Sequence, residues 1–150
     1  INMAYRGKYI PINPKKYKGN PSNVVYRSLW ERKLMVYCDM NDKILEWGSE
    51  EIIIPYISPW DNKMHRYFPD FYMKVKQVDG SIKRFIVEVK PKYQCKPPTT
   101  NPSRKTKKWL NEVKTYTINQ AKWKYANEFC ELNNMEFKVL TEDHLNIKYK

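Results

Sequence analysis

Arg66-Tyr-Phe-Pro-Asp-Phe-Tyr72 and Ile86-Val-Glu-Val-Lys90 are two apolar stretches that flank Asp79-Gly80, a dipeptide typical of hairpin turns. The sequence therefore predicts two paired antiparallel strands. Side chains alternate along a strand, so Glu88 and Lys90 point to one face and the valine between them points to the other. An Asp on the first strand can then join a Glu and a Lys from the second at a single point.

The register of this hairpin decides whether Asp70 reaches that face. A two-residue loop at Asp79-Gly80 would pair Asp70 with Val89 and turn its carboxylate to the opposite side. A three-residue loop, residues 79–81, would set Asp70 opposite Lys90 and bring the charged side chains together. A functional site here therefore requires an odd-length loop or a bulge in the hairpin.

The three side chains would suit metal-assisted chemistry on a phosphate. Asp70 and Glu88 offer carboxylate oxygens, which Mg²⁺ (or Mn²⁺) prefers together with retained waters and substrate phosphate oxygens. Such an ion lowers the pKa of a bound water and polarises the phosphate. Lys90 could hold the attacking water or stabilise the transition state, and the backbone carbonyl of Val89 could also ligate.

A cross-strand salt bridge among the same three residues is the competing interpretation. Glu88 lies within Phe85-Ile-Val-Glu-Val, an otherwise apolar strand, so its side chain is expected among buried neighbours. Burying a carboxylate is costly without compensation, which favours a functional site over a simple surface ion pair.

A third acidic residue, Glu31, is expected on an early helix that Ser22 caps and that runs to about Asp39. Apolar residues follow Glu31 at three, four and seven positions, so its carboxylate points toward the apolar side of the helix. A salt bridge or a metal would explain a carboxylate in that place.

The chain is strongly basic, with 28 Lys and Arg against 16 Asp and Glu, a formal net charge of +12 and a pI near 9.5. That charge predicts a polyanionic partner, most simply nucleic acid. The sequence has no apolar run of about 18 residues and no basic amphipathic helix at a terminus, so a membrane is the less favoured polyanionic partner. The odd number of widely spaced cysteines argues against a disulfide framework or zinc site, and a reducing cytosol fits best.

Two basic segments are candidates for DNA contacts. The first is an extended arm over about residues 3–21, where three prolines forbid a long helix. Its tyrosines and lysines could either track a DNA strand or pack on the domain. The second is a proline-rich loop over 91–108 that is expected to lack regular structure. The candidate DNA-binding residues are Lys8, Lys15, Lys16, Lys92, Lys96, Arg104, Lys105, Lys107 and Lys108. Ile1-Asn2 precede Met3 and would be a vector remnant if Met3 is the native start.

The remaining pattern predicts a single α/β (mixed α+β) domain over residues 1–150, with a central mixed sheet flanked by helices. The predicted elements are a helix over 22–39, strands over 44–47, 51–57, 65–77 and 81–90, a helix over 108–132, a strand over 137–140, and a last short helix capped by Thr141.

This arrangement resembles the PD-(D/E)XK nuclease superfamily, whose motif is matched by Pro69-Asp70 and Glu88-Val89-Lys90. The restriction-endonuclease-like core of that superfamily has a similar order of elements, and Glu31 matches an extra carboxylate of many members. The downstream half, a long helix followed by Glu136-Phe-Lys-Val-Leu-Thr-Glu142, is similar to the TnsA-type endonuclease branch.

Nearly the whole chain is also similar to the head completion nucleases of myovirus tailed phages. The stretches that carry this resemblance include Asn13-Pro-Lys-Lys-Tyr17, Leu45-Glu-Trp-Gly-Ser-Glu-Glu51, His65-Arg-Tyr-Phe-Pro-Asp70 and Ala121-Lys-Trp123. The resemblance implies a Mg-dependent endonuclease that cuts DNA during virion assembly in the host cytoplasm, with phage head or portal proteins as partners and an association with the virion. It also implies a contact to the site or to DNA from Gln120 or Lys122; helical geometry cannot put both on one side, and Gln120 is favoured.

Alternatives from other classes stay open. One is a non-catalytic DNA-binding assembly protein that keeps the nuclease fold, although the intact Asp-Glu-Lys set argues against it. Another is a transposase-type or restriction-type endonuclease. The short chain has no room for a separate target-recognition domain, which favours structure-specific over sequence-specific cleavage. A monomer and a homodimer are equally compatible with the sequence.

Overall fold

A four-stranded mixed sheet forms the centre of the protein. The computed structural model describes residues 6–99 and 103–145 of the chain. The sheet has the order β3-β6-β7-β8, in which the first three strands are antiparallel and β8 runs parallel to β7. Its strands are β3 (Ile44–Ser49), β6 (Phe71–Lys76), β7 (Ile82–Val89) and β8 (Glu136–Leu140). The predicted mixed sheet and fold class are confirmed.

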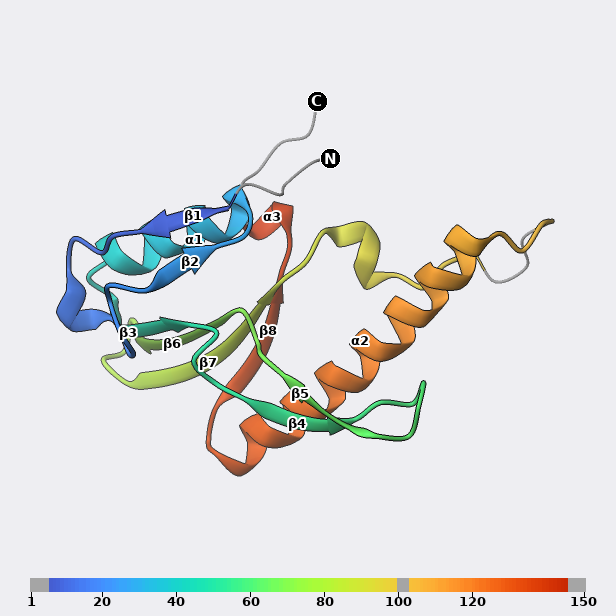
Figure 1. Cartoon of the computed structure of the whole chain (residues 1–150). Coiled ribbons are helices and arrows are strands. Elements are labelled where there is room, and N and C mark those ends of the chain that lie inside the picture. The colour runs from blue at the N-terminus through green and yellow to red at the C-terminus, as the bar shows by residue number, and fades with distance from the viewer. Residues whose placement is uncertain (1–5, 100–102, 146–150) are drawn as a thin grey trace.

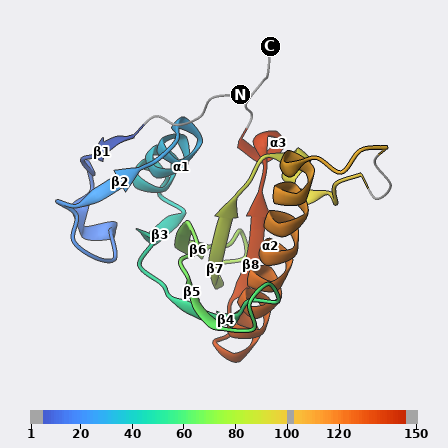
Figure 2. The ribbon, with the colours of Figure 1, turned by 45° about the vertical axis from the view of Figure 1, so that its right-hand side comes forward.

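Helices cover both faces of this sheet (Figures 1 and 2). On one face, α1 (Leu29–Met40) buries Leu34 and Met35 against Phe71 and Val87 of the sheet. On the other face, α2 (Lys107–Leu132) buries Ala126 and Cys130 against Tyr72 and Ile86. Alternate residues of β6 and β7 therefore enter different cores, as the period of a strand requires. Among the described residues, no helix has the length and apolar character to span a membrane.

Smaller elements complete the fold around these layers. They are β1 (Gly7–Tyr9), η1 (Pro14–Lys16), β2 (Val24–Tyr26), β4 (Ile54–Ile57), β5 (Met64–Tyr67), η2 (Lys92–Cys95) and α3 (Glu142–Leu145). The strands β1 and β2 pair with each other, and β4 and β5 form a second two-stranded arm. This second arm lies against α2, where the rings of Tyr56 and Tyr125 meet edge to face with centroids 6.3 Å apart.

The β6–β7 hairpin has an odd-length loop, as predicted, although the specific pairing differs. The loop is Val78–Gly80, closed by a hydrogen bond from the Gln77 N–H to the Ser81 carbonyl. Gly80 has φ +87°, the left-handed conformation that a three-residue hairpin loop requires and that glycine adopts most easily. Tyr72 pairs with Ile86, so the register sets Asp70 opposite Glu88 instead of Lys90. A shift of two residues keeps every side chain on the same face of the sheet, so Asp70 lies on the α2-facing side together with Glu88.

Two predicted boundaries were wrong. The first helix begins at Leu29 with Ser28 as its cap, since the Ser28 hydroxyl accepts from the Glu31 N–H at 3.1 Å; the β-branched residues after Ser22 form β2 instead. The strand predicted over 65–77 is interrupted at Phe68-Pro-Asp70 because Pro69 cannot donate a ladder hydrogen bond. Its two halves, β5 and β6, belong to different sheets.

The segment after Glu88 is more regular than the predicted loop over 91–108. Pro91, with φ −59°, leads directly into η2, and α2 already begins at Lys107. Proline is tolerated at the start of a helical turn because its N–H would lack a partner there anyway. Thr106 caps α2 by accepting from the Trp109 N–H at 3.1 Å.

The basic N-terminal arm is folded onto the domain. Tyr9 and Tyr17 are buried and their rings contact Trp47 edge to face. Of the two interpretations of this arm, packing is therefore the one that the structure shows for these tyrosines. The first five residues, including Met3, lie outside the described part of the chain.

Asp39 at the end of α1 fixes this arm in place. Its carboxylate, fully buried, accepts hydrogen bonds from the Tyr9 hydroxyl at 2.5 Å and from the backbone N–H groups of Ile12 and Asn13 at 2.7 and 3.0 Å. Burial acts to raise the pKa of Asp39, but these hydrogen bonds outweigh it and lower the pKa below the ordinary 3.8. The arm is therefore held by a carboxylate that must be charged.

We expect Asp39→Ala to lower the free energy of unfolding at pH 7 by about 2–4 kcal/mol, because it leaves the buried Tyr9 hydroxyl and two partly buried backbone N–H groups without their acceptor. Urea unfolding of both proteins measures the difference. A depressed pKa contributes stability above about pH 3.8 that is lost as the pH falls. The unfolding free energies of the wild type and of Asp39→Ala should therefore approach each other below about pH 4. The exposed neighbour Asp42, changed to Ala, is the matched control and should behave like the wild type.

Candidate active site

Asp70 and Glu88 lie side by side on the α2-facing side of the sheet. Asp70 precedes β6, and its carboxylate accepts a hydrogen bond from the Val89 N–H at 2.7 Å. Glu88, on β7, is only 6 % exposed. Burial and the nearby Glu88 carboxylate raise the pKa of Asp70 well above its ordinary value, against the opposing effect of the Val89 N–H. Two adjacent carboxylates that are partly shielded from water can bind a cation.

Two neighbours orient the Glu88 carboxylate. The Tyr67 hydroxyl donates to Glu88 Oε1 at 2.6 Å, and Lys90 Nζ lies 3.4 Å from Oε2. Burial, followed by the charge of Glu88, raises the pKa of Tyr67, so its phenol stays protonated and acts as the donor. Lys90 is thus on the same side as Glu88, as strand alternation predicts.

Lys122 approaches the same carboxylates from α2. Its amine lies over the rings of Tyr67 and Tyr56, 5.5 and 5.9 Å from their centroids. Burial lowers the pKa of Lys122, while the charges of Glu88 and Asp70 act in the opposite direction. Gln120, favoured from the sequence, is exposed, because residues two apart on a helix point to nearly opposite sides. The structure therefore brings Lys122, and not Gln120, toward Asp70 and Glu88.

Glu31 is near the pair without joining it. It lies on α1, which packs on the opposite face of the sheet, and its charge acts on both Asp70 and Glu88. Its own carboxylate accepts from the Arg27 N–H at 3.3 Å. Burial raises the pKa of Glu31, with smaller contributions from Glu50 and Glu88. Glu31 thus adds negative potential at the site and also stabilises the start of its helix, in the manner of a capping box.

The donor set fits a hard divalent cation bound by few protein ligands. Within residues 6–99 and 103–145, no three His, Cys, Asp or Glu side chains are arranged to hold one metal ion. Two carboxylates are nevertheless what Mg²⁺ commonly takes from a protein, with waters and substrate phosphates supplying the remaining oxygens. Burial and the Glu88 charge raise the pKa of Asp70 despite the nearby Lys90, so added positive charge would stabilise the ionised pair.

The candidate DNA-binding residues fall into two groups. Most are exposed: Lys8, Lys15, Lys96, Arg104, Lys105, Lys107 and Lys108. Lys16, which is half-buried, and Lys92, which is exposed, both make contacts within the chain. Lys16 Nζ donates to the carbonyls of Asp39 and Asn41 at 3.0 and 2.9 Å, at the end of α1, and Lys92 Nζ pairs with Asp143 at 3.0 Å.

Two residues near the site, Tyr67 and Glu50, were not anticipated from the sequence. Tyr67 was missed because Pro69 is the only sequence signal of the strand break that follows it, and a proline does not predict that Tyr67 contacts Glu88. Glu50, which ion-pairs with Arg27, follows β3 with φ +55°, a conformation that is uncommon for a glutamate and that no pattern predicts. Its backbone N–H donates to the Asp70 carbonyl at 3.1 Å and so helps to hold the turn before β6.

Comparison with known proteins finds one matching family and one similar phage protein. The family described as "TnsA-like endonuclease N terminal" matches residues 41–142, which include Asp70, Glu88, Lys90 and Lys122. The head completion nuclease of Enterobacteria phage T4 is 41 % identical over 147 residues, covering 95 % of this chain and 95 % of the phage protein. The chain therefore belongs to the TnsA-like endonuclease family, within the PD-(D/E)XK nucleases that its motif predicts.

Proposed function

We propose that this protein is a metal-dependent endonuclease that hydrolyses phosphodiester bonds in DNA. The observation that carries the proposal is the adjacent carboxylates of the half-buried Asp70 and the buried Glu88, which two lysines approach. The family match and the T4 relative support nuclease activity. The formal charge of +12 supports a polyanionic substrate.

Asp70, Glu88 and the Val89 carbonyl would hold the metal, and Glu31 would add negative potential or bind through water. When bound, the ion supplies an activated water and polarises the scissile phosphate. The Tyr67 hydroxyl and the Val89 N–H fix the two carboxylates in orientation before substrate arrives. Lys90 and Lys122 bring positive charge to the place where negative charge develops on the phosphate.

We propose that the protein acts in phage head completion, the step named in the description of its T4 relative. We place that step in the host cytoplasm, with head or portal proteins as partners and a place in the virion. We propose structure-specific cutting because the residues that the structure describes, 6–99 and 103–145, all belong to the nuclease fold. The DNA structures that we propose as substrates are ends, branches and single-stranded tails of packaged DNA.

The test is cleavage of flapped, branched and linear DNA with Mg²⁺, with Mn²⁺ and with a chelator. We expect cleavage only with metal, restored when excess metal follows the chelator, and strongest on DNA with single-stranded parts. Asp70→Ala, purified identically, controls for contaminating nucleases and should be inactive. Equal cleavage by both proteins would refute the site assignment, and no cleavage by the wild type would favour a non-catalytic DNA-binding assembly protein.

A further inference from the structure

A groove lies between η2 and the N-terminal half of α2; Figure 1 shows where these two elements lie in the fold. The groove has a volume of about 800 Å³. Three lysines, Lys96, Lys107 and Lys108, line it, with Glu112 as its one acidic residue among those described. The groove therefore carries a net positive charge and would attract an anionic ligand.

An unpartnered polar group lies at the end of the groove nearest the carboxylates. Asn119 lines the groove and is only 5 % exposed, yet its amide nitrogen has no hydrogen-bond acceptor within the described part of the chain. Leaving a buried donor unpaired costs about 1–3 kcal/mol, so such a group needs an explanation. A ligand that brings an acceptor, such as a phosphate or base oxygen, would supply it.

An aromatic side chain faces the same groove from the other wall. Tyr93, on η2, lines the groove and is 70 % exposed. Exposed aromatic rings beside lysines are the arrangement on which the bases of a single strand stack, because every base has a π-face. Tyr116 on α2 adds a second ring to the lining.

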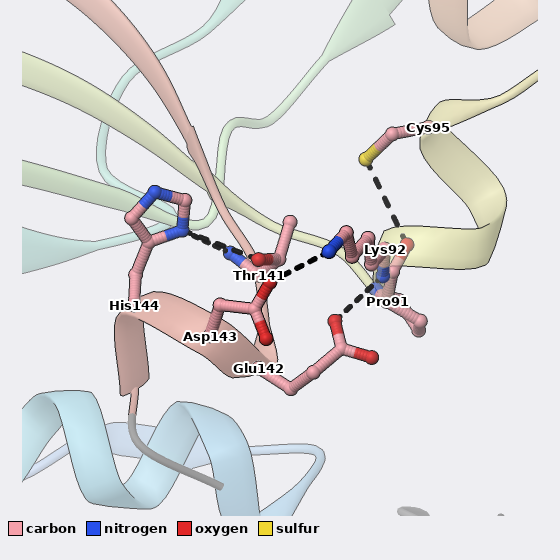
Figure 3. Close-up of polar contacts among 7 residues, drawn as sticks. All are labelled: Pro91, Lys92, Cys95, Thr141, Glu142, Asp143 and His144. Carbon is pink, nitrogen blue, oxygen red and sulfur yellow. Dashed lines mark hydrogen bonds and ion pairs between the residues drawn. The ribbon is translucent and has the colours of Figure 1, made fainter.

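The wall that carries Tyr93 is anchored by α3 (Figure 3). The Lys92 N–H donates to Glu142 Oε1 at 2.7 Å, and Lys92 Nζ pairs with Asp143 Oδ2 at 3.0 Å. The Lys90 N–H donates to the Leu140 carbonyl at 2.9 Å, which joins the start of this wall to β8. Tyr93 is thus presented from a fixed support, which lowers the entropic cost of binding.

The groove and the carboxylate site share the helix α2. Asn119 and Lys122 are three residues apart, so they lie on neighbouring parts of one face of α2. From Asn119 to Lys107 the helix rises about 18 Å at 1.5 Å per residue, the length of about five stacked nucleotides at 3.4 Å each.

We propose that this groove binds a single-stranded DNA segment that extends from the phosphate held at Asp70 and Glu88. Lysines contact its phosphates, Tyr93 stacks on a base, and Asn119 donates to an oxygen of the strand nearest the carboxylates. This inference rests on the proposed nuclease function and deepens it, because it makes an unpaired strand the feature that the protein recognises.

The test is binding of a fluorescent oligothymidylate of about ten nucleotides, a length within the usual range for single-strand sites. Anisotropy is measured with a chelator present, so that cleavage does not enter. Tyr93→Ala is expected to weaken binding about 5- to 150-fold, the range for loss of one base–aromatic stack. Lys107→Ala should also weaken it, and should reduce the slope of log K against log salt by about 0.7.

Asn119→Ala separates a binding role from a structural one. Because its amide nitrogen has no partner and Ala favours helices, the melting temperature should not fall, while oligothymidylate affinity should. The matched controls are Tyr37→Ala, an exposed tyrosine on α1, and Lys124→Ala, an exposed lysine on another side of α2. Both should bind like the wild type, and all variants are checked by thermal unfolding.

The outcomes separate the groove from the active site. Weakened oligothymidylate binding by the groove variants, with blunt-duplex binding within about twofold of the wild type, supports the groove even if no DNA is ever cleaved. Groove variants that bind oligothymidylate like the controls overturn it, even if the wild type cleaves DNA. Equal losses for single strand and duplex also overturn it, since they indicate only a general basic surface.

Discussion

Asp70→Asn should abolish DNA cleavage and at the same time make the protein more stable. We expect activity to fall by at least about 10³-fold, the upper range for removing one group that stabilises transition-state charge. The melting temperature should rise by a few degrees, at about 2–4 °C per kcal/mol for a chain of this size. A substitution that removes an unfavourable charge from an active site is expected to raise stability while it lowers activity.

The physical reason is the environment of the Asp70 carboxylate. Burial and the Glu88 charge raise its pKa above the ordinary 3.8, so the folded state binds this proton more tightly than the unfolded state does. Stability therefore falls as the pH rises from about 4 toward the raised pKa. The asparagine carries no charge, can still accept from the Val89 N–H, and offers its amide to Glu88.

Melting temperatures of both proteins between about pH 3 and pH 8 measure this effect. The melting temperatures of the wild type and of Asp70→Asn should be equal at the acid end, where Asp70 is protonated in both the folded and the unfolded state. They should diverge as the pH rises. Added Mg²⁺ should then raise the melting temperature of the wild type more than that of Asp70→Asn, because a ligand that binds the folded state stabilises it. Asp42→Asn, at an exposed position, is the control. A less stable Asp70→Asn at pH 7 would show that the carboxylate pair is not strained by its own charge.

The fold was largely predictable because its decisive signals are local. The odd-length hairpin follows from Gly80 and from the requirement that Asp70 share a face with Glu88, and the structure confirms that parity. The two-residue shift in pairing was not predictable, since a loop of residues 78–80 and one of residues 79–81 put the same side chains on the same face. The β2 strand was missed because Ser22 and Ser28 both precede plausible helices, and only tertiary pairing with β1 distinguishes them.

The arrangement around the site was less predictable, because it depends on which elements meet. Strand alternation alone places Glu88 and Lys90 together. Helical periodicity says that Gln120 and Lys122 face different ways, but not which way the long helix is turned against the sheet. Its orientation is set by Ala126 and Cys130, which pack against Ile86 and carry Lys122 to the site. Glu31 was correctly expected near buried groups, but its helix lies on the other face.

The second large effect is expected at Lys90. We expect Lys90→Met to lower kcat about 10²- to 10³-fold, because Lys90 Nζ is the cation closest to Glu88, at 3.4 Å, and methionine keeps its length without its charge. Lys122→Met should cost less, about tenfold, since its amine lies over two tyrosine rings and makes no ion pair within 4 Å among the described residues. Gln120→Ala, exposed on the same helix, should leave kcat unchanged.

Single-turnover cleavage at saturating metal separates these effects from weaker DNA binding, because it reports the chemical step once the substrate is bound. Lys90→Arg is the informative companion variant. An arginine preserves the charge but has a planar, extended head group, so partial recovery would mean that charge near Glu88 is what matters. No recovery would mean that the compact ammonium must fit one position, as it must if it holds the attacking water. If Lys90→Met stays active while Lys122→Met does not, the cation that serves the reaction comes from α2, and the Glu-x-Lys pattern marks only the strand that carries Glu88.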